Sequence, residues 1–175
     1  MREVTVNEWG ESMKKQVISI LVENHAGVLS KVVGLFSRRG FNIDSLAVGT
    51  TQDISVSRIT IVVDNNDYIV SQLTKQLNKL IDVIEIKLLN ESDSVRRELV
   101  LIKIRTDSKT RQEVMQMADI FRAKIVDVSN GTLTVEMTGT EDKISAFLGI
   151  AEGFGIEELV KTGTIAIERG INILK

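Results

Sequence analysis

The sequence predicts an α+β protein of two small domains, each with the element order β-α-β-β-α-β. Short β-branched apolar runs alternate with stretches whose apolar residues recur at i, i+3, i+4 and i+7, the spacing of one helix face. One full set of six elements is complete by residue 89, and the same order restarts after the polar run 90–94. This order is that of the split βαβ sandwich, the ferredoxin-like fold.

The first elements surround a polar turn. Residues 16–22 form an apolar, β-branched run that predicts a strand, and the turn 23–27 follows it. The stretch 29–36 carries one apolar stripe and predicts a helix. That helix ends at residues 38–40 (Arg-Arg-Gly), where cations lie near the negative helix end and glycine suits a left-handed cap. Residues 45–51 predict the second strand.

The first set continues with a turn at 52–55 and a third strand at 58–63. Residues 64–67 (Asp-Asn-Asn-Asp) have side chains that can cap the start of a helix. Apolar residues at near-helical spacing then predict a second helix over 69–80, and 83–89 predicts the fourth strand.

The second half repeats this pattern. A hairpin is expected across Asn130-Gly131, a dipeptide typical of a type I′ turn. In order, we expect a strand at 99–105, a helix capped by 107–110 and running to 122, hairpin strands at 124–129 and 132–138, a helix at 141–150, a closing strand at 156–160 and an edge strand at 165–168.

The domain boundaries follow from these patterns. Residues 1–15 read as an N-terminal extension that lacks the apolar core of a signal peptide, so a cytoplasmic location is expected. The first domain is expected over 16–90 and the second over 95–175, with the polar run between them as a linker.

Composition excludes several classes of function. The chain has no cysteine, which rules out disulfides and cysteine–metal sites, and its single histidine rules out a polyhistidine metal site within one chain. A net charge of −2 gives no electrostatic reason to expect nucleic acid or an anionic membrane as a partner. The longest apolar runs are far below the ~20 residues that a membrane helix needs.

Motifs for catalysis are also missing from the sequence. There is no recognisable triad and no glycine-rich phosphate loop, so a stand-alone enzyme is not expected. RNA-binding domains share the β-α-β-β-α-β order, but they need aromatic residues on the central strands, and strand 58–63 has none. A copper chaperone of this fold would need a paired-cysteine loop. We therefore expect no catalytic residue and no metal site.

The turn after the first strand is the candidate binding site. A helix start leaves backbone N–H groups unpaired, and Gly27 would let a ligand approach the backbone closely. Such a site can hold a carboxylate, and the amide of Asn24 adds donors and an acceptor. The structural alternative is that Asn24 and Gly27 only cap the helix and shape the turn, and the pattern alone favours that alternative.

A resemblance favours the binding interpretation. Residues 22–30 (VENHAGVLS) and 34–46 (GLFSRRGFNIDSL) resemble the first ACT domain of the small, regulatory subunit of acetohydroxyacid synthase, also called acetolactate synthase. The resemblance continues at 57–61, 76–83, 95–99 and 120–123, outside the part that a generic ACT domain would share. It covers nearly the whole chain apart from the extension and the tail.

The resemblance implies an effector site that two chains share. In this family two first domains pair side by side as a homodimer, with a branched-chain amino acid, valine above all, between one chain's turn and its partner. His25, the only histidine, is expected to lie beside the ligand or to be an exposed turn residue. The implied effector-binding residues are Asn24, His25, Ala26, Gly27, Val28 and Leu29 of one chain with Asn42 and Ile43 of the other.

The resemblance also implies the biological role. The chain would bind a larger catalytic subunit that holds thiamine diphosphate, magnesium and FAD, raise its activity, and make it sensitive to valine in branched-chain amino acid biosynthesis. No cofactor is expected in this chain itself. The second half lacks the Asn-x-x-Gly turn and would serve assembly or partner contact. The alternative is an ACT-type amino-acid sensor that regulates a different enzyme.

Overall fold

The computed structural model describes residues 15–64 and 67–174. These residues divide into two compact units. The first unit runs to Val95 and includes the chain again from Ala166 onward, and the second unit is Arg96–Ile165. Each unit is described by itself below.

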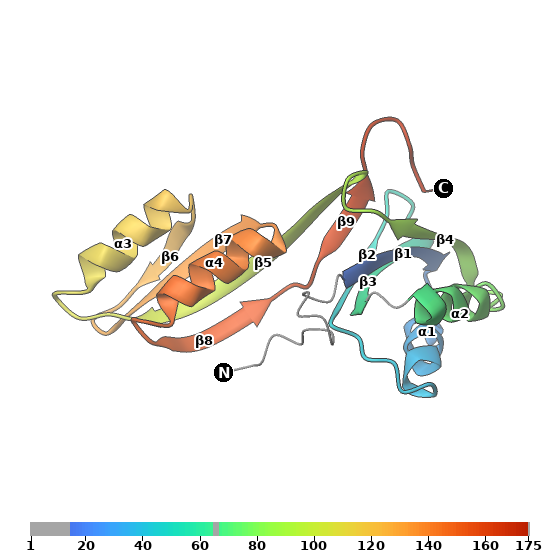
Figure 1. The fold of residues 1–175 in the computed structure, drawn as a ribbon, viewed down its shortest axis with the longest axis horizontal. Helices are drawn as coiled ribbons and strands as arrows, with labels where there is room; N and C mark the ends of the chain where they lie inside the picture. Colours follow the sequence, from blue (N-terminus) through green and yellow to red (C-terminus); the bar gives the residue numbers. More distant parts are fainter. Residues whose placement is uncertain (1–14, 65–66, 175) are drawn as a thin grey trace. The chain divides into compact units, whose positions relative to one another are not determined.

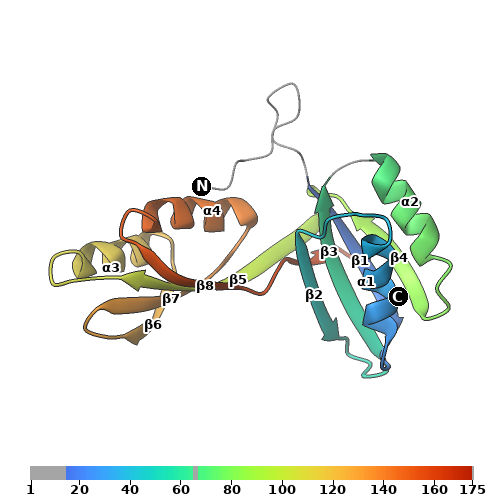
Figure 2. The ribbon, with the colours of Figure 1, turned by 90° about the horizontal axis from the view of Figure 1, so that it is seen from below.

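The first unit confirms the expected element order. Its sheet has the strand order β2-β3-β1-β4, every neighbouring pair is antiparallel, and both helices cover one face (Figure 1, Figure 2). This is the ferredoxin-like arrangement. The elements are β1 (Lys15–Glu23), α1 (Val28–Ser37), β2 (Ser45–Thr50), β3 (Val56–Asp64), α2 (Asp67–Leu77) and β4 (Val83–Leu89).

Alternation along the central strand builds the core of the first unit. Ile18, Ile20 and Val22 of β1 point toward the helices and are at most 2% exposed. They pack with Phe36 of α1 and Leu73 of α2, which are fully buried. Successive side chains of a strand point to opposite faces, so Val17, Ser19 and Leu21 lie on the reverse face of the sheet.

The reverse face of the first sheet is also buried. Val17, Val62 and Leu89 form a small apolar cluster with Ala166 of β9 (Ile165–Glu168). The segment that follows is fixed by a backbone hydrogen bond of 2.8 Å from the N–H of Arg169 to the carbonyl of Asp93. The C-terminal residues are therefore part of the first unit's fold.

The second unit has its own sheet and core. Its strands take the order β6-β7-β5-β8, again antiparallel. Ile102, Val135 and Phe147 are fully buried, and Phe147 meets Phe121 edge-on with ring centroids 5.3 Å apart. The elements are β5 (Ser94–Arg105), α3 (Arg111–Ile120), β6 (Lys124–Val128), β7 (Thr132–Gly139), α4 (Glu141–Ala151) and β8 (Ile156–Lys161).

Three domain boundaries differ from the sequence expectation. Lys15, assigned to the extension, begins β1, while residues 1–14 lie outside the described part. The expected linker 90–94 ends in Ser94, which instead begins β5, and its buried hydroxyl donates to the Asn90 carbonyl at 2.5 Å. Residues from Ala166 onward group with the first unit, whereas the sequence placed them in a domain at 95–175. The helix-cap residues expected at 65–66 are outside the described residues.

The β6–β7 hairpin forms as expected, but its turn type was wrong. Neither Asn130 nor Gly131 has a positive φ, which a type I′ turn requires at both positions. Arg111 of α3 donates from one nitrogen to the carbonyls of Ser129 and Asn130, both at 2.8 Å, and the N–H of Thr106 donates to the Gly131 carbonyl. These tertiary bonds hold the turn in a different conformation.

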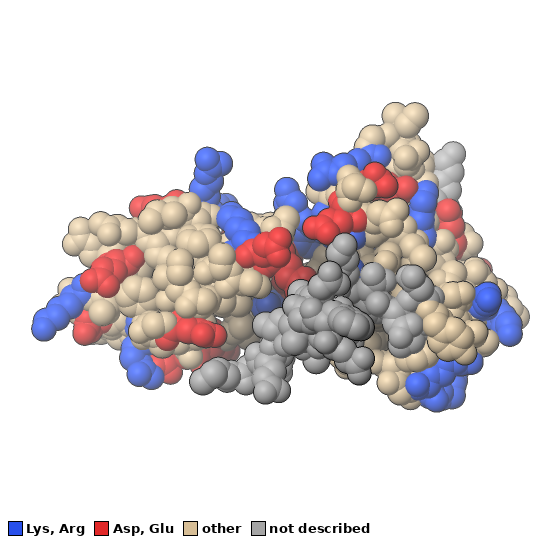
Figure 3. Space-filling view, viewed as in Figure 1, with Lys and Arg blue, Asp and Glu red and all other residues tan. Residues whose placement is uncertain are grey.

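The surface agrees with the small net charge. Figure 3 shows acidic and basic side chains interspersed over the described residues of this face, without a broad area of one sign. Among residues 15–64 and 67–174, no helix is both long enough and apolar enough to cross a bilayer.

Candidate functional site

The candidate turn begins α1 without a side-chain cap. Gly27 is the N-cap residue, with a φ of +91°, and no side-chain cap hydrogen bond is present at this helix start among the described residues. The first bond of the helical pattern is the one from the Lys31 N–H to the Gly27 carbonyl, at 3.0 Å. The N–H groups of Leu29 and Ser30, in the first turn of the helix, have no acceptor within the helix. With the positive end of the helix dipole, they suit a carboxylate.

The space in front of Gly27 is open. A Cβ built on Gly27 would meet no heavy atom within 4 Å. The positive φ favours glycine at this position, because L-residues reach it only with strain. A side chain introduced here would project into the space in front of the helix start.

Asn24 holds two loops together. Its Nδ2 donates to the carbonyl of Ile54 at 2.8 Å, and its backbone N–H donates to the carbonyl of Ser55 at 2.7 Å. The loop between β2 and β3 is itself fixed, because Asp53 accepts from the Ser55 N–H and hydroxyl, and these bonds lower the pKa of Asp53. One amide donor of Asn24 is therefore used within the fold, which leaves its Oδ1 and second hydrogen for a ligand.

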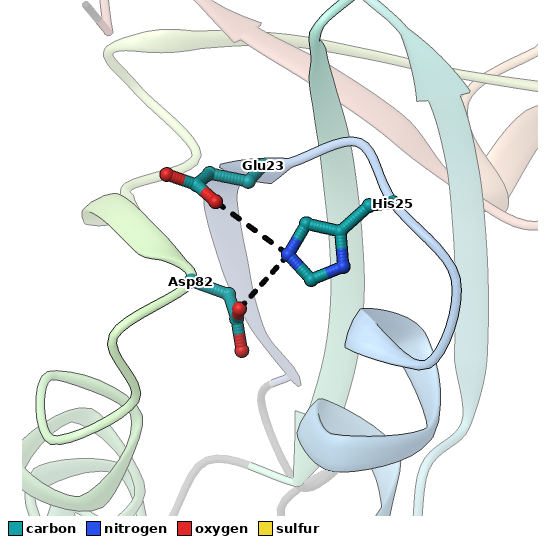
Figure 4. Close-up of side chains that lie close together, drawn as sticks. All are labelled: Glu23, His25 and Asp82. Atoms are coloured by element: carbon teal, nitrogen blue, oxygen red, sulfur yellow. Dashed lines mark hydrogen bonds and ion pairs between the residues drawn. The ribbon is translucent and has the colours of Figure 1, made fainter.

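His25 turns away from the helix start toward two carboxylates. Figure 4 shows its ring pointing at Glu23 and Asp82, with Nε2 3.0 Å from Asp82 Oδ1 and 3.5 Å from Glu23 Oε2. Nδ1 lies 3.2 Å from the carbonyl of Ala26. His25 is thus an exposed turn residue that fixes the turn to the loop before β4.

Asp82 is the centre of this cluster. The residue is only 8% exposed, and its Oδ2 accepts from Lys31 of α1 at 2.7 Å. This hydrogen bond is the main cause that holds the pKa of Asp82 below its ordinary value of 3.8, and His25 contributes to the same shift. The backbone carbonyl of Asp82 also accepts from the Glu23 N–H at 2.9 Å.

The cluster has the donor types of a metal site. Ligand-type atoms of Glu23, His25 and Asp82 lie within 4.8 Å of one another. Lys31 already places a positive charge against the Asp82 carboxylate, however, and Glu23 and His25 are largely exposed. These contacts explain the cluster as a structural ion pair.

The other expected site residues divide between the core and the surface. Val28 is 2% exposed and packs in the first core, so only its backbone faces the turn. Leu29 is 41% exposed beside the helix start. Ile43 is half-buried against the same core, and Asn42 is exposed, with Nδ2 3.0 Å from Asp44 Oδ1.

Asn42 and Ile43 lie apart from the other expected site residues of the same chain. The others lie together in the turn and the start of α1: Asn24, His25, Ala26, Gly27, Val28 and Leu29. Strands β1 and β2 both run antiparallel to β3 and therefore parallel to each other. Glu23, at the turn, pairs with Val56, whereas Ser45, just after Asn42, pairs with Val62. Val56 and Val62 are six positions apart on β3, roughly 20 Å along the strand.

The sequence reasoning missed Lys31, Ile54 and Asp82 as neighbours of the turn. Lys31 lies one helical turn after Gly27, on the face expected for solvent. Asp82 and Ile54 reach the turn only through tertiary structure, and neither carries a local pattern that marks it.

Comparisons with known proteins agree over both units. Residues 18–85 match the family described as "AHAS small subunit-like ACT domain", and 97–170 match "Small subunit of acetolactate synthase". A probable acetolactate synthase small subunit from Archaeoglobus fulgidus is 51% identical over 156 residues, which are 89% of this chain and 98% of that protein. The acetolactate synthase small subunit of Mycolicibacterium smegmatis is 52% identical over 87% of this chain and 90% of its own.

One solved structure is similar to this chain over most of its length. The crystal structure of the acetolactate synthase small subunit from Thermotoga maritima aligns with a TM-score of 0.83 at 38% identity. The alignment covers 90% of this chain and 98% of that one.

Proposed function

Because this chain belongs to the family of acetolactate synthase small subunits, which are regulatory, we propose that it senses valine or another branched-chain amino acid for its catalytic partner. The amino acid binds at the uncapped start of α1. The chain activates the large subunit, which carries thiamine diphosphate, magnesium and FAD, and it inhibits that subunit when the amino acid is bound.

The observation that carries the proposal is the geometry at Gly27. The helix start has unpaired N–H groups, no side-chain cap and open space in front of it. A carboxylate accepts hydrogen bonds from such groups and is favoured by the helix dipole. The effector carboxylate therefore binds to the backbone of residues 27–30, and Asn24 Oδ1 accepts from the effector's ammonium group.

A second copy of the chain completes the site. β2 is an edge strand of its sheet, with Val48 47% exposed, and among the described residues no further strand pairs with its outer edge. In a two-fold dimer two β2 strands pair antiparallel, so the end of one lies beside the start of the other. This pairing brings the turn of one copy toward Asn42 and Ile43 of the second copy.

Apolar side chains give the site its preference for aliphatic amino acids. Leu29 is exposed beside the carboxylate position, and Ile43 of the second copy lies next to Asn42. They contact the aliphatic side chain of the effector. One methylene changes binding by only ~1–3 kcal/mol, so valine, leucine and isoleucine differ in affinity by modest factors.

Coupling of valine binding to catalytic activity requires a difference in valine affinity between two states of the complex. Valine can inhibit only if it binds one arrangement of the complex more tightly than another, typically by ~1–3 kcal/mol. The cluster of His25, Lys31 and Asp82 connects the turn to α1 and to the loop before β4, and it can transmit a shift of the turn to both.

The test uses two variants that are each defective on one side of the site. Gly27→Asp blocks the turn, and Asn42→Ala removes the contact from the second copy. Valine binding is measured by calorimetry for each variant alone and for an equimolar mixture after subunit exchange. In a mixed dimer one of the two sites contains an intact turn and an intact Asn42.

We expect little binding by either variant alone and partial recovery in the mixture. With random exchange half of the dimers are mixed, so about a quarter of all sites are restored. No recovery in a mixture shown to contain mixed dimers would mean that both residues act within one chain. Unchanged binding by both single variants would remove the turn from the effector site.

A further inference from the structure

The first unit contains a cavity on the reverse face of its sheet, away from α1 and α2. Its volume is about 190 Å³, and it lies between the strands and the C-terminal segment. Its walls include Ser19, Arg58 and Leu89 of the sheet with Ile167, Glu168 and Ile173 of the segment. At ~30 Å³ for each water, this space is enough for about six water-sized groups.

Ser19 is a buried hydroxyl without a partner. It lies in the middle of β1, opposite Thr60 of β3 and Lys87 of β4, and it is 1% exposed. Its Oγ has no hydrogen bond to any described residue. Leaving such a group unpaired typically costs ~1–3 kcal/mol, which an occupant of the cavity would offset by bonding to it.

The charges around the cavity favour an anion. Glu168 is neutralised, because its Oε2 lies 2.7 Å from Lys87 Nζ. Arg58 is half-buried and has no ion-pair or hydrogen-bond partner among the described residues. A guanidinium can hold a carboxylate through two parallel hydrogen bonds. The rest of the lining consists of the apolar Leu89, Ile167, Ile173 and Leu174, together with Gly170 and the polar Asn172.

We propose that this cavity is a second binding site, for a small aliphatic carboxylate. Arg58 binds the carboxylate, the Ser19 hydroxyl donates to it, and Leu89, Ile167 and Ile173 contact the aliphatic part. The site is separate from the turn at Gly27, because Arg58 and Ser19 point away from the helices. It does not depend on the proposed effector site.

The occupant contacts both the sheet and the segment that covers it. Ser19, Arg58 and Leu89 belong to three strands, and Ile167 and Ile173 belong to the C-terminal segment. Binding therefore stabilises the packing of this segment against the sheet, and it raises the unfolding temperature of the first unit by mass action.

The test titrates 3-methylbutanoate into the full chain up to about 20 mM, because a ligand this small is expected to bind in the millimolar range. Binding is followed by calorimetry and by amide chemical shifts in β1 and residues 166–174. The same titration is done with Arg58→Gln, Ser19→Ala, Gly27→Asp and Arg105→Gln. Arg105 is a matched control, an arginine of the second unit that pairs with Glu157.

We expect saturable binding that Arg58→Gln weakens at least ~10-fold, because a charged bidentate contact is lost. Ser19→Ala should weaken binding and yet raise the unfolding temperature of the ligand-free chain, since the unpaired hydroxyl is gone. Gly27→Asp and Arg105→Gln should bind as the native chain does.

Three results would overturn the proposal. Absence of saturable binding by the native chain means that the cavity holds water only. Equal binding by Arg58→Gln and the native chain means that Arg58 does not hold the carboxylate. Loss of binding in Gly27→Asp places the carboxylate at the helix start instead, a result that leaves the proposed effector site standing.

Discussion

Asn24 and Ile54 are 30 residues apart in sequence, yet the Asn24 side chain donates to the Ile54 carbonyl at 2.8 Å. The bond joins the turn before α1 to the loop between β2 and β3. Ile54 itself is 81% exposed at the tip of that loop. The position of the candidate turn is therefore set by a loop that was not part of the expected site.

Replacing Asn24 by alanine should loosen this loop. The variant loses the bond to the Ile54 carbonyl but keeps the backbone bond to Ser55, so we expect a cost of about 0.5–1.5 kcal/mol. Amide hydrogen exchange at Ser55 and Val56 should become faster, while amides of the second unit keep their rates. Unchanged exchange at both residues would mean that Asn24 does not hold the loop.

A negative charge at position 27 should separate the role of the turn in valine inhibition from any role in activating the catalytic subunit. Asn and Asp have the same shape and both tolerate a positive φ better than other residues, so Gly27→Asn and Gly27→Asp carry similar strain. We expect Gly27→Asp to abolish valine inhibition and Gly27→Asn only to weaken it. Acetolactate formation by the catalytic subunit, measured with and without valine, provides the test.

Both Gly27 variants should still activate the catalytic subunit. Activation that is lost in both to the same extent would place Gly27 in the fold or in the contact between subunits. Equal valine inhibition by the two variants would show that no carboxylate approaches this helix start.

The ion pair of Lys31 and Asp82 predicts that the stability of the first unit depends on pH. Because folding lowers the pKa of Asp82, its contribution to stability is full above the ordinary value of 3.8 and is lost as pH falls through the lower value in the folded chain. Asp82→Asn should therefore be less stable than the native chain near neutral pH, and the difference should disappear in strong acid.

Hydrogen exchange of β1 amides, corrected for intrinsic rates between pH 3 and 7, measures this difference in the first unit. Asp127→Asn, at an exposed carboxylate of β6 in the second unit, is the control. A stability difference for Asp82→Asn that stays constant down to the lowest pH would remove the ion pair as its cause.

The aromatic pair in the second unit should dominate its stability. Phe147 is fully buried and Phe121 is its edge-on partner, so Phe147→Ala leaves a cavity and should cost about 3–5 kcal/mol. Exchange of β7 amides reports the loss. Ile150→Ala, on the exposed side of the same helix, should have little effect. A small effect of Phe147→Ala would mean that the core refills the space.

Local patterns predicted the elements because each helix and strand has an apolar period that matches its geometry. Ile18, Ile20 and Val22 alternate on β1, and Gly40 takes the positive φ of +66° expected after α1. The edge strand at 165–168 also forms. Local patterns do not predict features that tertiary hydrogen bonds fix, such as the conformation of the Asn130-Gly131 turn, which the bonds from Arg111 hold.

The candidate site was predictable only in its backbone part. Asn24 and Gly27 mark a turn before a helix, and the structure has that turn, with Gly27 in a left-handed conformation. The bond from His25 to Asp82 spans 57 residues and depends on the position of β4 beside β1, which no local pattern encodes. Ser19 resembles an ordinary polar residue in an apolar strand, and its burial depends on the distant C-terminal segment.

Asn24 and Asn42 lie at opposite ends of one sheet, so a site that needs both is divided into half-sites on different chains. In the proposed two-chain site, effector affinity would depend on protein concentration: dilution below the dimerisation constant would weaken valine binding, and valine in turn would favour association. Each substitution in the site also occurs twice in a homodimer. A shortage of the regulatory chain would therefore reduce both the number of sensors and the sensitivity of those that remain.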